Sequence, residues 1–463
     1  MRVGVIGAGI VGVTTAYELA EDGHDVTVFE RHSSVASEAS FAHAGVLGSG
    51  DVVPWAAPGL PGRLLRDLFS RHPAMRVRPS FDAMQWRWLW RWWSACRAPN
   101  FPQRRIELLR LAQYSRERLR VLDERLQLDF ERSQGLLLLL REERDVAAAQ
   151  PRLALLRELG ISVRELDAAA CHTTEPGLNR EQPLAGGIQL PQDGVGNCRQ
   201  FAHLLRDAAE RLGVEFRFGT VVRALETGTR SDGAELQLEH LALTTGFASS
   251  RATAIPGGNG NKHGSAMAHR ARAAARYLDP VSAEAFDAVV IAAGVDAAEL
   301  LPGLGIKLPL MPVHGYSLTA PLRSPERGPK AALVDERYRI AMSRLGQRVR
   351  LAGCAELGGS VQTQRRAAVE TLYRLLNDWF PGAAHIARPQ VWKGARPTLP
   401  DGLPLIGPSP RPGVWLNLGH ADHGWTLACG SARLLADQIA GRSPGFDPGS
   451  FALARAASGP PPA

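Results

Sequence analysis

Three glycines near the N-terminus have the spacing that binds a dinucleotide. Gly7, Gly9 and Gly12 form a G-x-G-x-x-G pattern between a short β-branched apolar run and a segment of helical composition. The first glycine permits a tight turn out of a strand, the second lets a pyrophosphate approach the backbone, and the third lets the helix pack close to the sheet. Glu30 ends the next apolar run, about 20 residues further on, where a carboxylate accepts hydrogen bonds from ribose hydroxyls. This stretch predicts a dinucleotide site, and the motif by itself does not separate NAD from FAD.

The residues around this turn are the predicted contacts of the cofactor. A helix that begins after the glycines offers unpaired N–H groups and the positive end of its dipole to a phosphate. A signal peptide is the alternative interpretation, and fixed glycine spacing ahead of an acidic amphipathic helix argues against it. The predicted contacts in the turn, at the end of the second strand and in the small-residue loop after it are Val5, Ile6, Gly7, Ala8, Gly9, Ile10, Val11, Gly12, Glu30, Arg31, Ser40, His43, Ala44 and Gly45.

A second signature lies near the C-terminus. Gly394-Ala395-Arg396-Pro397 precedes a glycine-rich turn at 419–424 that opens a helix, and such a turn again directs N–H groups at an anionic partner. An isoalloxazine ring, which gains negative charge on reduction, would be such a partner. Val222 follows a short strand and could line an adenine pocket, or the strand could be a plain edge strand. The further predicted cofactor contacts are Val222, Ala293, Gly294, Gly394, Gly419, Gly424, Trp425 and Thr426.

An α/β fold must position these signatures. The apolar runs at 2–6, 26–29 and 286–294 predict buried parallel strands of a Rossmann-like sheet. Alternation over 308–320 and 337–354 predicts antiparallel strands, and the leucine pattern over 106–126 predicts a long amphipathic helix. We expect a Rossmann-like nucleotide-binding domain interleaved with an α+β substrate domain that carries a mixed or antiparallel sheet.

Both domains are expected to be discontinuous in sequence. The nucleotide-binding domain is predicted to comprise residues 1–50, 188–300 and 390–456, and the substrate domain residues 51–187 and 301–389. Residues 240–280 are rich in Ala, Gly, Ser and Arg, which predicts an exposed, flexible insertion.

The charge balance does not indicate a nucleic-acid partner. The 463 residues carry a formal net charge of +8, but almost all of the positive charge is arginine, because lysine occurs only at 262, 307, 330 and 393. This pattern, together with heavy use of alanine, indicates a compositional bias, and no nucleic-acid motif is present. Attraction to anionic membrane surfaces is a weaker alternative.

Cysteine usage indicates a reducing compartment. The five cysteines are scattered and form no C-x-x-C pair, which argues against a disulfide framework and a structural zinc site, so no metal is expected. No apolar run approaches the ~20 residues of a membrane span. The sequence therefore predicts a cytoplasmic protein. Peripheral contact with the inner face of the cytoplasmic membrane is the alternative.

Tryptophans and arginines alternate in the segment 85–93. One interpretation is an interfacial segment, with indoles at the level of lipid headgroups and guanidinium groups on phosphates. The alternative, which we favour, is a helix packed into the second domain with its arginines extending to solvent.

The two ends of the chain together resemble the FAD-dependent D-amino acid oxidase superfamily, and within it the small subunits of bacterial D-amino acid dehydrogenases. The resemblance runs through almost the whole chain. Besides the glycine turn, it is carried by Pro54-Trp55-Ala56-Ala57-Pro58-Gly59, Gly187-Ile188-Gln189-Leu190-Pro191, Gly315-Tyr316-Ser317-Leu318-Thr319, Gly394-x-Arg396-Pro397 with Pro400-Asp401-Gly402, and Gly419-His420 with Gly424-Trp425-Thr426.

The resemblance implies FAD as the cofactor and oxidative deamination as the reaction. A D-amino acid would lose a hydride from Cα to flavin N5, the imino acid would hydrolyse to a 2-oxo acid and ammonia, and a quinone or respiratory-chain acceptor would take the electrons. Arg396 is the expected ligand of the substrate carboxylate, since a guanidinium binds a carboxylate bidentately. Tyr338 and Tyr316 are the other expected catalytic residues. Relatives that attach flavin covalently use a cysteine near the position of Arg396, and none is near it in this sequence, so FAD is expected to be non-covalent.

The chain departs from the family pattern at several positions. His43 stands where Asn is usual, His314 stands where Lys is usual, and Asp422-His423 replaces small or apolar residues beside the flavin-capping turn. These departures bear on substrate range and flavin potential. A glycine- or sarcosine-type amine oxidase and a D-hydroxyproline dehydrogenase stay open as alternatives, and a non-catalytic dinucleotide-binding module is an alternative of a different class.

Overall fold

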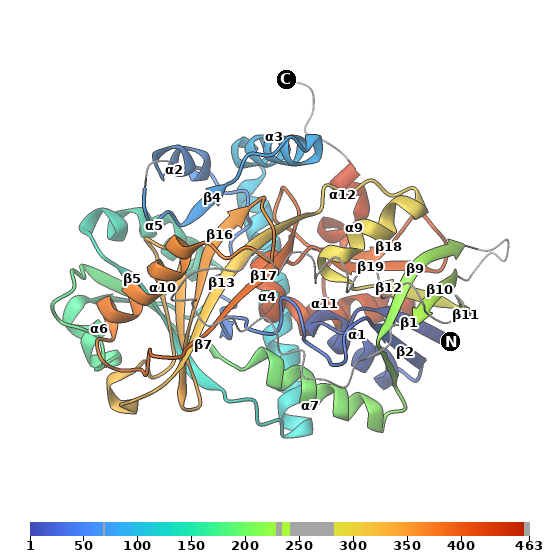
Figure 1. Ribbon diagram of the computed structural model, residues 1–463, viewed down its shortest axis with the longest axis horizontal. Helices are drawn as coiled ribbons and strands as arrows, with labels where there is room; N and C mark the ends of the chain where they lie inside the picture. The colour runs from blue at the N-terminus through green and yellow to red at the C-terminus, as the bar shows by residue number, and fades with distance from the viewer. Residues whose placement is uncertain (68–69, 228–233, 241–281, 458–463) are drawn as a thin grey trace, which may run out of the picture.

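The computed structural model describes residues 1–67, 70–227, 234–240 and 282–457. Of the predicted insertion at 240–280, residues 241–280 lie outside this described part. Within it, the strands form a mainly parallel sheet, a larger mixed sheet and a small antiparallel sheet. Figure 1 shows the parallel sheet at the right and the larger sheet at the left.

The parallel sheet begins at the N-terminus, as the apolar run predicts. Its strands lie in the order β18-β19-β12-β1-β2-β8, and only β18 runs antiparallel to its neighbour. The strands are short, and all except the edge strand β8 are mostly buried, which is typical of a parallel sheet covered on both faces. Their bounds are β1 (Arg2–Ile6), β2 (Asp25–Glu30), β8 (Glu215–Phe218), β12 (Ala288–Ile291), β18 (Leu405–Pro408) and β19 (Val414–Leu418).

Helices cover one face of the parallel sheet, and one of them also contacts the larger sheet. Helix α1 (Ile10–Glu21) packs against α7 (Cys198–Arg211) and α11 (Gly424–Ile439), and α11 packs against α4 (Phe101–Leu126). The last crossing is very close, because a Cβ added to Gly430 of α11 would lie 2.7 Å from Cβ of Ser115 on α4. Helix α11 also contacts β18 of the parallel sheet and β3 of the larger sheet, so it joins the two.

A small antiparallel sheet covers the other face. Its strands β9 (Thr220–Thr227), β10 (Ala234–His240) and β11 (Ser282–Phe286) lie in the order β11-β10-β9. Leu236 and Phe286 pack so closely on β1 that a Cβ at Gly4 would lie 3.3 Å from each side chain. Val289 and Ile291 of β12 share this apolar cluster.

The larger sheet is mostly antiparallel. Its main path is β17-β13-β16-β15-β14-β5-β7-β3, and β4 and β6 pair at its sides with β16 and β7. Parallel pairs occur only at β14 with β5 and at β16 with β4, within the described strands. The bounds are β3 (Val46–Leu47), β4 (Met75–Val77), β5 (Ser133–Leu140), β6 (Arg164–Asp167), β7 (Gly186–Val195), β13 (Met311–Pro321), β14 (Ala332–Asp335), β15 (Ile340–Leu345), β16 (Arg348–Leu357) and β17 (Gln390–Thr398).

The remaining helices surround this sheet or connect strands. Helix α10 packs on β13 and β16 through an apolar face that ends in the fully buried Trp379. Helix α5 begins with a capping box, because Glu142 and Asp145 each accept from the other's backbone N–H. The bounds are α2 (Leu60–Arg66), α3 (Ala83–Arg97), α5 (Glu143–Glu158), α6 (Ala168–Thr174), α9 (Ala297–Leu300), α10 (Arg366–Trp379) and α12 (Leu453–Ala457).

The tryptophan-rich segment forms α3 and presents two different faces. Trp88 and Trp92 are fully buried, which agrees with the packed-helix interpretation. Their indole N–H groups donate to the carbonyl groups of Thr398 and Trp55, at 3.1 and 2.9 Å. Trp86 and Trp90 lie on the opposite face and are 53% and 63% exposed. The helix is therefore both a packed element and a carrier of exposed indoles.

The predicted fold class is confirmed: an α/β fold in which a Rossmann-like parallel sheet is interleaved along the chain with a mixed sheet. The division into domains stays a prediction. One of its boundaries falls within a strand of the larger sheet, since residue 188 lies inside β7, and another coincides with the start of β17 at residue 390. No helix in the described ranges combines the length and apolar character needed to cross a bilayer.

Candidate active site

A single cavity of about 1070 Å³ is lined by both sequence signatures. It runs from the glycine turn after β1, past the 419–424 turn, to β13, β16 and β17 of the larger sheet. The N-terminal cradle near Gly9 and the guanidinium group of Arg396 thus open into one space. This convergence is the geometry that a cofactor and its substrate require.

The glycine turn has the strained and crowded geometry that its sequence predicts. Gly7 has φ +101°, and a Cβ on Gly12 would lie 1.8 Å from the carbonyl oxygen of Gly7. Gly9 is different, because its added Cβ would meet only Oγ of Ser40, at 3.6 Å. Gly7 and Gly12 therefore hold the turn together, while Gly9 leaves the backbone open to the cavity.

The carboxylate of Glu30 is fixed at the end of β2. Its oxygens accept hydrogen bonds from the backbone N–H groups of Ala8 and His32, at 2.8 and 2.9 Å. Glu30 also lines the cavity, so the carboxylate faces it while tying β2 to the glycine turn. Arg31 beside it forms ion pairs with Glu38 and Asp296, at 3.0 and 2.8 Å.

The structure brings most of the predicted cofactor residues to the cavity. Those that line it are Ile6, Gly7, Gly9, Ile10, Val11, Glu30, Arg31, Ser40, His43, Ala44, Val222, Ala293, Gly294, Gly394, Gly419, Gly424, Trp425 and Thr426. Val5, Ala8, Gly12 and Gly45 lie behind this lining. Val5 and Ala8 are fully buried, and Gly45 takes φ +86° where the chain turns toward β3.

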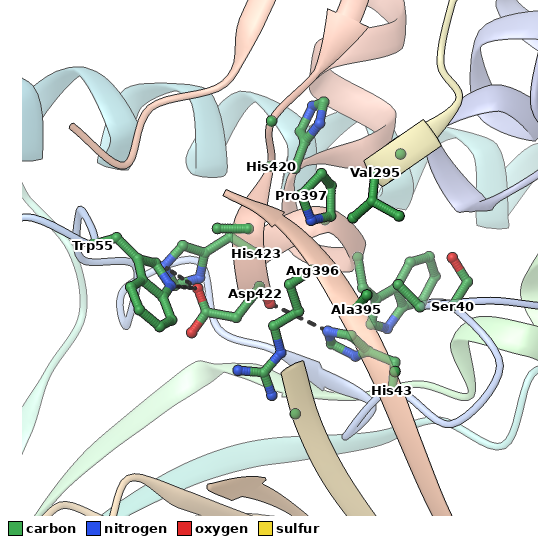
Figure 2. A pocket seen from close by; sticks show the side chains of 18 of the residues that line it. Ser40, His43, Trp55, Val295, Ala395, Arg396, Pro397, His420, Asp422 and His423 are labelled. Carbon is green, nitrogen blue, oxygen red and sulfur yellow. Dashed lines mark hydrogen bonds and ion pairs between the residues drawn. The ribbon is translucent and has the colours of Figure 1, made fainter. Parts of the chain in front are cut away.

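Arg396 lies on β17 with its guanidinium group over the backbone of β13. A Cβ on Gly315 would lie 2.5 Å from Nη2 of Arg396, so only glycine leaves room for this side chain. The β13–β16 pairing is irregular between His314 and Tyr316, where Gly315 sits. Across the described residues, the guanidinium group of Arg396 has neither a hydrogen-bond acceptor nor an ion-pair partner within reach, and it faces the cavity (Figure 2).

Asp422 supplies a negative charge close to Arg396. Burial alone would raise the pKa of Asp422, but His423, Arg396 and the indole N–H of Trp55 together lower it to about 2. Trp55 Nε1 donates to Oδ1 of Asp422 at 2.9 Å. Figure 2 shows Trp55, Asp422 and His423 on one side of Arg396 and His43 on the other.

Two buried histidines at the site are neutral. Burial lowers the pKa of His43 to about 4 and that of His420 to about 3. Nδ1 of His43 accepts from the N–H of Gly45 at 3.1 Å, so Nε2 carries the proton and donates to the carbonyl group of Asp422 at 3.3 Å. With both ring nitrogens engaged, His43 positions the 422 turn.

The two predicted tyrosines have different places. Tyr316 lines the cavity, but its hydroxyl donates to Glu356 at 2.7 Å, and burial with this hydrogen bond raises its pKa. Tyr338 is not among the cavity-lining residues. Its ring packs among Arg141, Arg337 and Arg374, and its hydroxyl accepts from Arg374 at 3.3 Å. The structure therefore does not bring Tyr338 to the site.

Two cysteines that are distant in the sequence also border the cavity. Cys198 and Cys354 line it, and burial raises the pKa of each thiol to about 12. Both thiols stay protonated at neutral pH, and a protonated thiol is a poor nucleophile. Their state is consistent with the expectation that the flavin is held non-covalently.

A match to a family model shows which family this chain belongs to. Residues 2–438 match the model described as "FAD dependent oxidoreductase", the DAO family. The chain belongs to this family. It is an FAD-dependent oxidoreductase, which excludes the non-catalytic alternative.

The similar proteins cover nearly the whole chain. It is 39% identical over 457 residues to a D-amino acid dehydrogenase of Cereibacter sphaeroides, which covers 98% of this chain and 95% of that protein. It is 37% identical over 458 residues to a D-amino acid dehydrogenase of Rhizorhabdus wittichii, covering 98% and 100%. Among solved structures, glycine oxidase from Geobacillus kaustophilus superposes with a TM-score of 0.70 at 23% identity, covering 98% of each chain.

The residues present fit FAD. Helix α1 begins at Ile10, after the N-cap residue Gly9, and has no acidic residue in its first turn, so its N-terminus suits a phosphate. The Ser40 hydroxyl accepts from the N–H of Ile10 at 3.1 Å. Elsewhere in the lining, three residues carry buried polar atoms that have no hydrogen-bond partner among the described residues, namely Asn417 Oδ1, Trp392 Nε1 and His420 Nε2. A ring system with hydrogen-bond donors and acceptors on its edge would satisfy such atoms.

Sequence reasoning missed several residues of this site as functional candidates. Asp422 was visible only as a departure from the family pattern, and Trp55 and Gly315 only as members of motifs. Each acts through a contact with a residue far away in the sequence. No local pattern contains that information.

Proposed function

We propose that this enzyme oxidises D-amino acids to 2-oxo acids and ammonia and passes the electrons to a quinone-type acceptor. One observation supports this most: an unpaired guanidinium group and an ionised carboxylate lie together in the cavity that the glycine turn also lines. A free amino acid at neutral pH carries one group of each sign. The names of the relatives agree with this proposal.

Arg396 and Asp422 divide the recognition of the substrate. Arg396 would bind the α-carboxylate through two parallel N–H···O bonds. Asp422 would accept from the α-ammonium group, and Trp55 and His43 hold the 422 turn in place for it. Binding at two points orients Cα, and orientation of this kind accounts for much of the rate in such reactions.

The chemistry needs a two-electron acceptor and a neutral amine. Bound FAD supplies the acceptor for the hydride that leaves Cα. The imino acid then takes up water and releases ammonia, which completes the 2-oxo acid. Since burial lowers the pKa values of His43 and His420 to about 4 and 3, neither would take up the ammonium proton of the substrate at neutral pH.

The exposed face of α3 supports a quinone as the electron acceptor, because this face could contact a membrane. Trp86 and Trp90 are exposed beside Met84, with Arg87 between them, and this face suits a surface of anionic lipid. We place the enzyme on the inner face of the cytoplasmic membrane, where quinones are available. The five described cysteines are all free and buried, as a reducing compartment would allow.

Vesicle sedimentation tests the membrane contact. The wild type should pellet with vesicles that contain phosphatidylglycerol, and the double variant Trp86→Ser/Trp90→Ser should not. Leu212→Ser, which removes an exposed apolar side chain on another face, is the control and should pellet like the wild type. Equal sedimentation of all three proteins, or of none, would refute the contact.

Anaerobic titration tests the activity itself. D-alanine should bleach the flavin absorption of the holoenzyme and L-alanine should not, and oxygen should restore the colour only slowly, with peroxide forming at the same slow rate. Faster bleaching by glycine, sarcosine or D-hydroxyproline would favour the alternative amine-oxidising reactions. Rapid peroxide formation would show that the enzyme is an oxidase.

A further inference from the structure

The cavity continues beyond the Arg396–Asp422 pair to a second group of charges. We call the following residues the distal cluster: Arg63, Arg105, Arg152, Arg339, Asp51 and Glu336. All six line the cavity. Four guanidinium groups face two carboxylates, so this end of the cavity carries an excess of positive charge.

Three of the four arginines are already engaged. Arg152 pairs with Asp51 and with Glu336, the latter at 3.1 Å, and Arg339 pairs with Glu336 at 2.8 Å. Despite burial, Arg339 and Arg152 hold the pKa of Glu336 at about 2, so this carboxylate is ionised. Arg63 donates to two backbone carbonyl groups, at 3.3 and 2.6 Å.

Arg105 is the exception. Its Nε and Nη2 atoms are buried and have no hydrogen-bond partner in the described structure. Burial, together with the charge of Arg152, lowers its pKa to about 10, so it is still a cation at neutral pH. Buried N–H groups without an acceptor are costly, and an anion that enters the cavity and accepts from them would relieve that cost.

Arg105 is electrostatically connected to the proposed substrate site. Arg339 interacts with Asp422 on one side and with Arg105 on the other. Arg105 comes from the second turn of α4, and Arg396 from β17, so the two guanidinium groups approach the cavity from different elements. A ligand that extends from Arg396 past Asp422 would meet the distal cluster next.

We propose that Arg105 binds the side-chain carboxylate of an acidic D-amino acid, so that D-aspartate or D-glutamate is preferred to neutral and basic substrates. This inference rests on the proposed function. The α-carboxylate would bind Arg396, the α-ammonium group Asp422, and the side-chain carboxylate Arg105. A neutral side chain leaves Arg105 unpaired, and a basic side chain adds repulsion from the distal cluster.

Substrate competition in the wild-type holoenzyme is the first test. Steady-state kcat/KM is measured with an artificial electron acceptor for D-aspartate, D-glutamate, D-alanine and D-lysine. An acidic substrate should exceed D-alanine by about 10-fold or more, and D-lysine should be the poorest, as expected for one charge-assisted contact. A preference for D-alanine or D-lysine would overturn the proposal for Arg105. If none of the four substrates bleaches the flavin, the proposed function fails instead.

The variant Arg105→Gln is the second test. The ratio of kcat/KM for the preferred acidic substrate to that for D-alanine should fall roughly 10- to 100-fold, mainly through KM for the acidic substrate. Arg105→Lys should restore part of the ratio, because it keeps the charge. Arg110→Gln, on the exposed side of the same helix, is the matched control and should leave the ratio unchanged. An unchanged ratio in Arg105→Gln would show that Arg105 has only a packing role.

Discussion

The residues around Arg396 leave its guanidinium group available to a substrate. Its guanidinium group lies over Gly315, where any side chain would displace it, and it forms no ion pair with Asp422 or any other described carboxylate, although its charge helps to lower the pKa of Asp422. Asp422 in turn is fixed by Trp55 and His43. Asp422 also lies 3.5 Å from Nε2 of His423, so its carboxylate is held in place while the guanidinium group of Arg396 stays unpaired for a substrate carboxylate.

The pH dependence of activity follows from the same residues. We predict that kcat/KM for D-alanine rises with pH up to the pKa of the substrate's own amine, because burial keeps the pKa values of His43 and His420 too low for either to take up the ammonium proton at neutral pH. The measurement is a pH–rate profile between pH 6 and about 10. An additional inflection near pH 6.5, removed in His43→Asn, would contradict this assignment.

Stability should fall in mild acid because of His420. The pKa of this histidine is about 3 in the folded chain, against an ordinary value of 6.5. A depressed histidine pKa means that the unfolded chain binds the proton first, so stability is constant above pH 6.5 and decreases as pH falls from 6.5 toward 3. Between pH 6.5 and 5 the loss should be about 2 kcal/mol.

Urea unfolding of the wild type and His420→Asn across this pH range measures the effect. The variant should have a flatter pH dependence by about 2 kcal/mol. Identical slopes for the two proteins would show that His420 is protonated with its ordinary pKa in the folded state.

Close contacts of helices α1 and α11 fix the position of the cavity walls. Helix α1 is held against the glycine turn by Gly12, and α11 is held against α4 by Gly430. Helix α11 also begins at the 424 turn that lines the cavity. Small residues at these crossings therefore determine where the walls of the site lie.

Substitution of Gly12 should remove FAD before it abolishes the fold. In Gly12→Ala the new Cβ would lie 1.8 Å from Gly7 O, which must displace the cradle. We expect purified Gly12→Ala to carry little flavin, as judged from its visible spectrum. Gly303→Ala, where none of the described residues lies within 4 Å of the added Cβ, is the control and should carry a full complement of flavin. Full flavin content in both variants would refute the role of Gly12.

Substitution of Gly430 should weaken the helix crossing instead. The added Cβ in Gly430→Ala lies within 3 Å of Ser115 on α4, and overpacking of this kind costs roughly 1–3 kcal/mol. Chemical denaturation of the variant should show this loss. The matched helical control is Gly62→Ala on α2, where nothing lies within 4 Å of the added Cβ. Equal stability of the two variants would show that α11 can move away without cost.

At the scale of the whole molecule, the chain passes repeatedly between the two sheets. Strand β3 follows β2 in sequence but pairs with β7 in the larger sheet, and β12 returns to pair with β1. The cavity is lined from both sheets, so FAD should stabilise the whole chain and not one part of it. FAD removal should therefore lower the unfolding temperature in a single transition.

A comparison of FAD with FMN in the same unfolding experiment tests whether the glycine-turn end of the cavity binds part of the cofactor. At a free concentration about 100 times its Kd, FAD should add about 2.7 kcal/mol to the stability of the apoprotein. FMN lacks the adenosine half that Glu30 and the α1 N-terminus are expected to bind, so it should stabilise less at the same concentration. Equal stabilisation by both flavins would argue that the glycine turn holds no part of the cofactor.

Sequence patterns predicted the parts of this fold that are encoded by residues close together in the sequence. The G-x-G-x-x-G turn, the buried strands and the long helix α4 have periodic or short-range signals, although α4 begins five residues before the predicted start. The segment 337–354 was predicted as one alternating region and is two strands, β15 and β16, that turn at Gly346. The sequence offered no sign that β3 and β7 belong to the larger sheet, because pairing partners are distant.

The same distinction holds for the candidate site. Arg396 and the glycine turn carry motifs, and the structure places both at one cavity. Tyr338 was expected there from resemblance alone and packs among arginines elsewhere. Arg105 has no motif, because its unpaired state depends on Arg152, Asp51 and Glu336 from three other segments.

The most direct measurement is anaerobic reduction of the flavin in Arg396→Gln by D-alanine, followed by stopped-flow absorbance. The variant should retain FAD, because Arg396 lies at the substrate end of the cavity. Half-maximal reduction should need roughly 100-fold more D-alanine than in the wild type, as expected when a bidentate carboxylate contact is lost. An unchanged D-alanine dependence with FAD bound would contradict the account that Arg396 holds the substrate beside the cofactor.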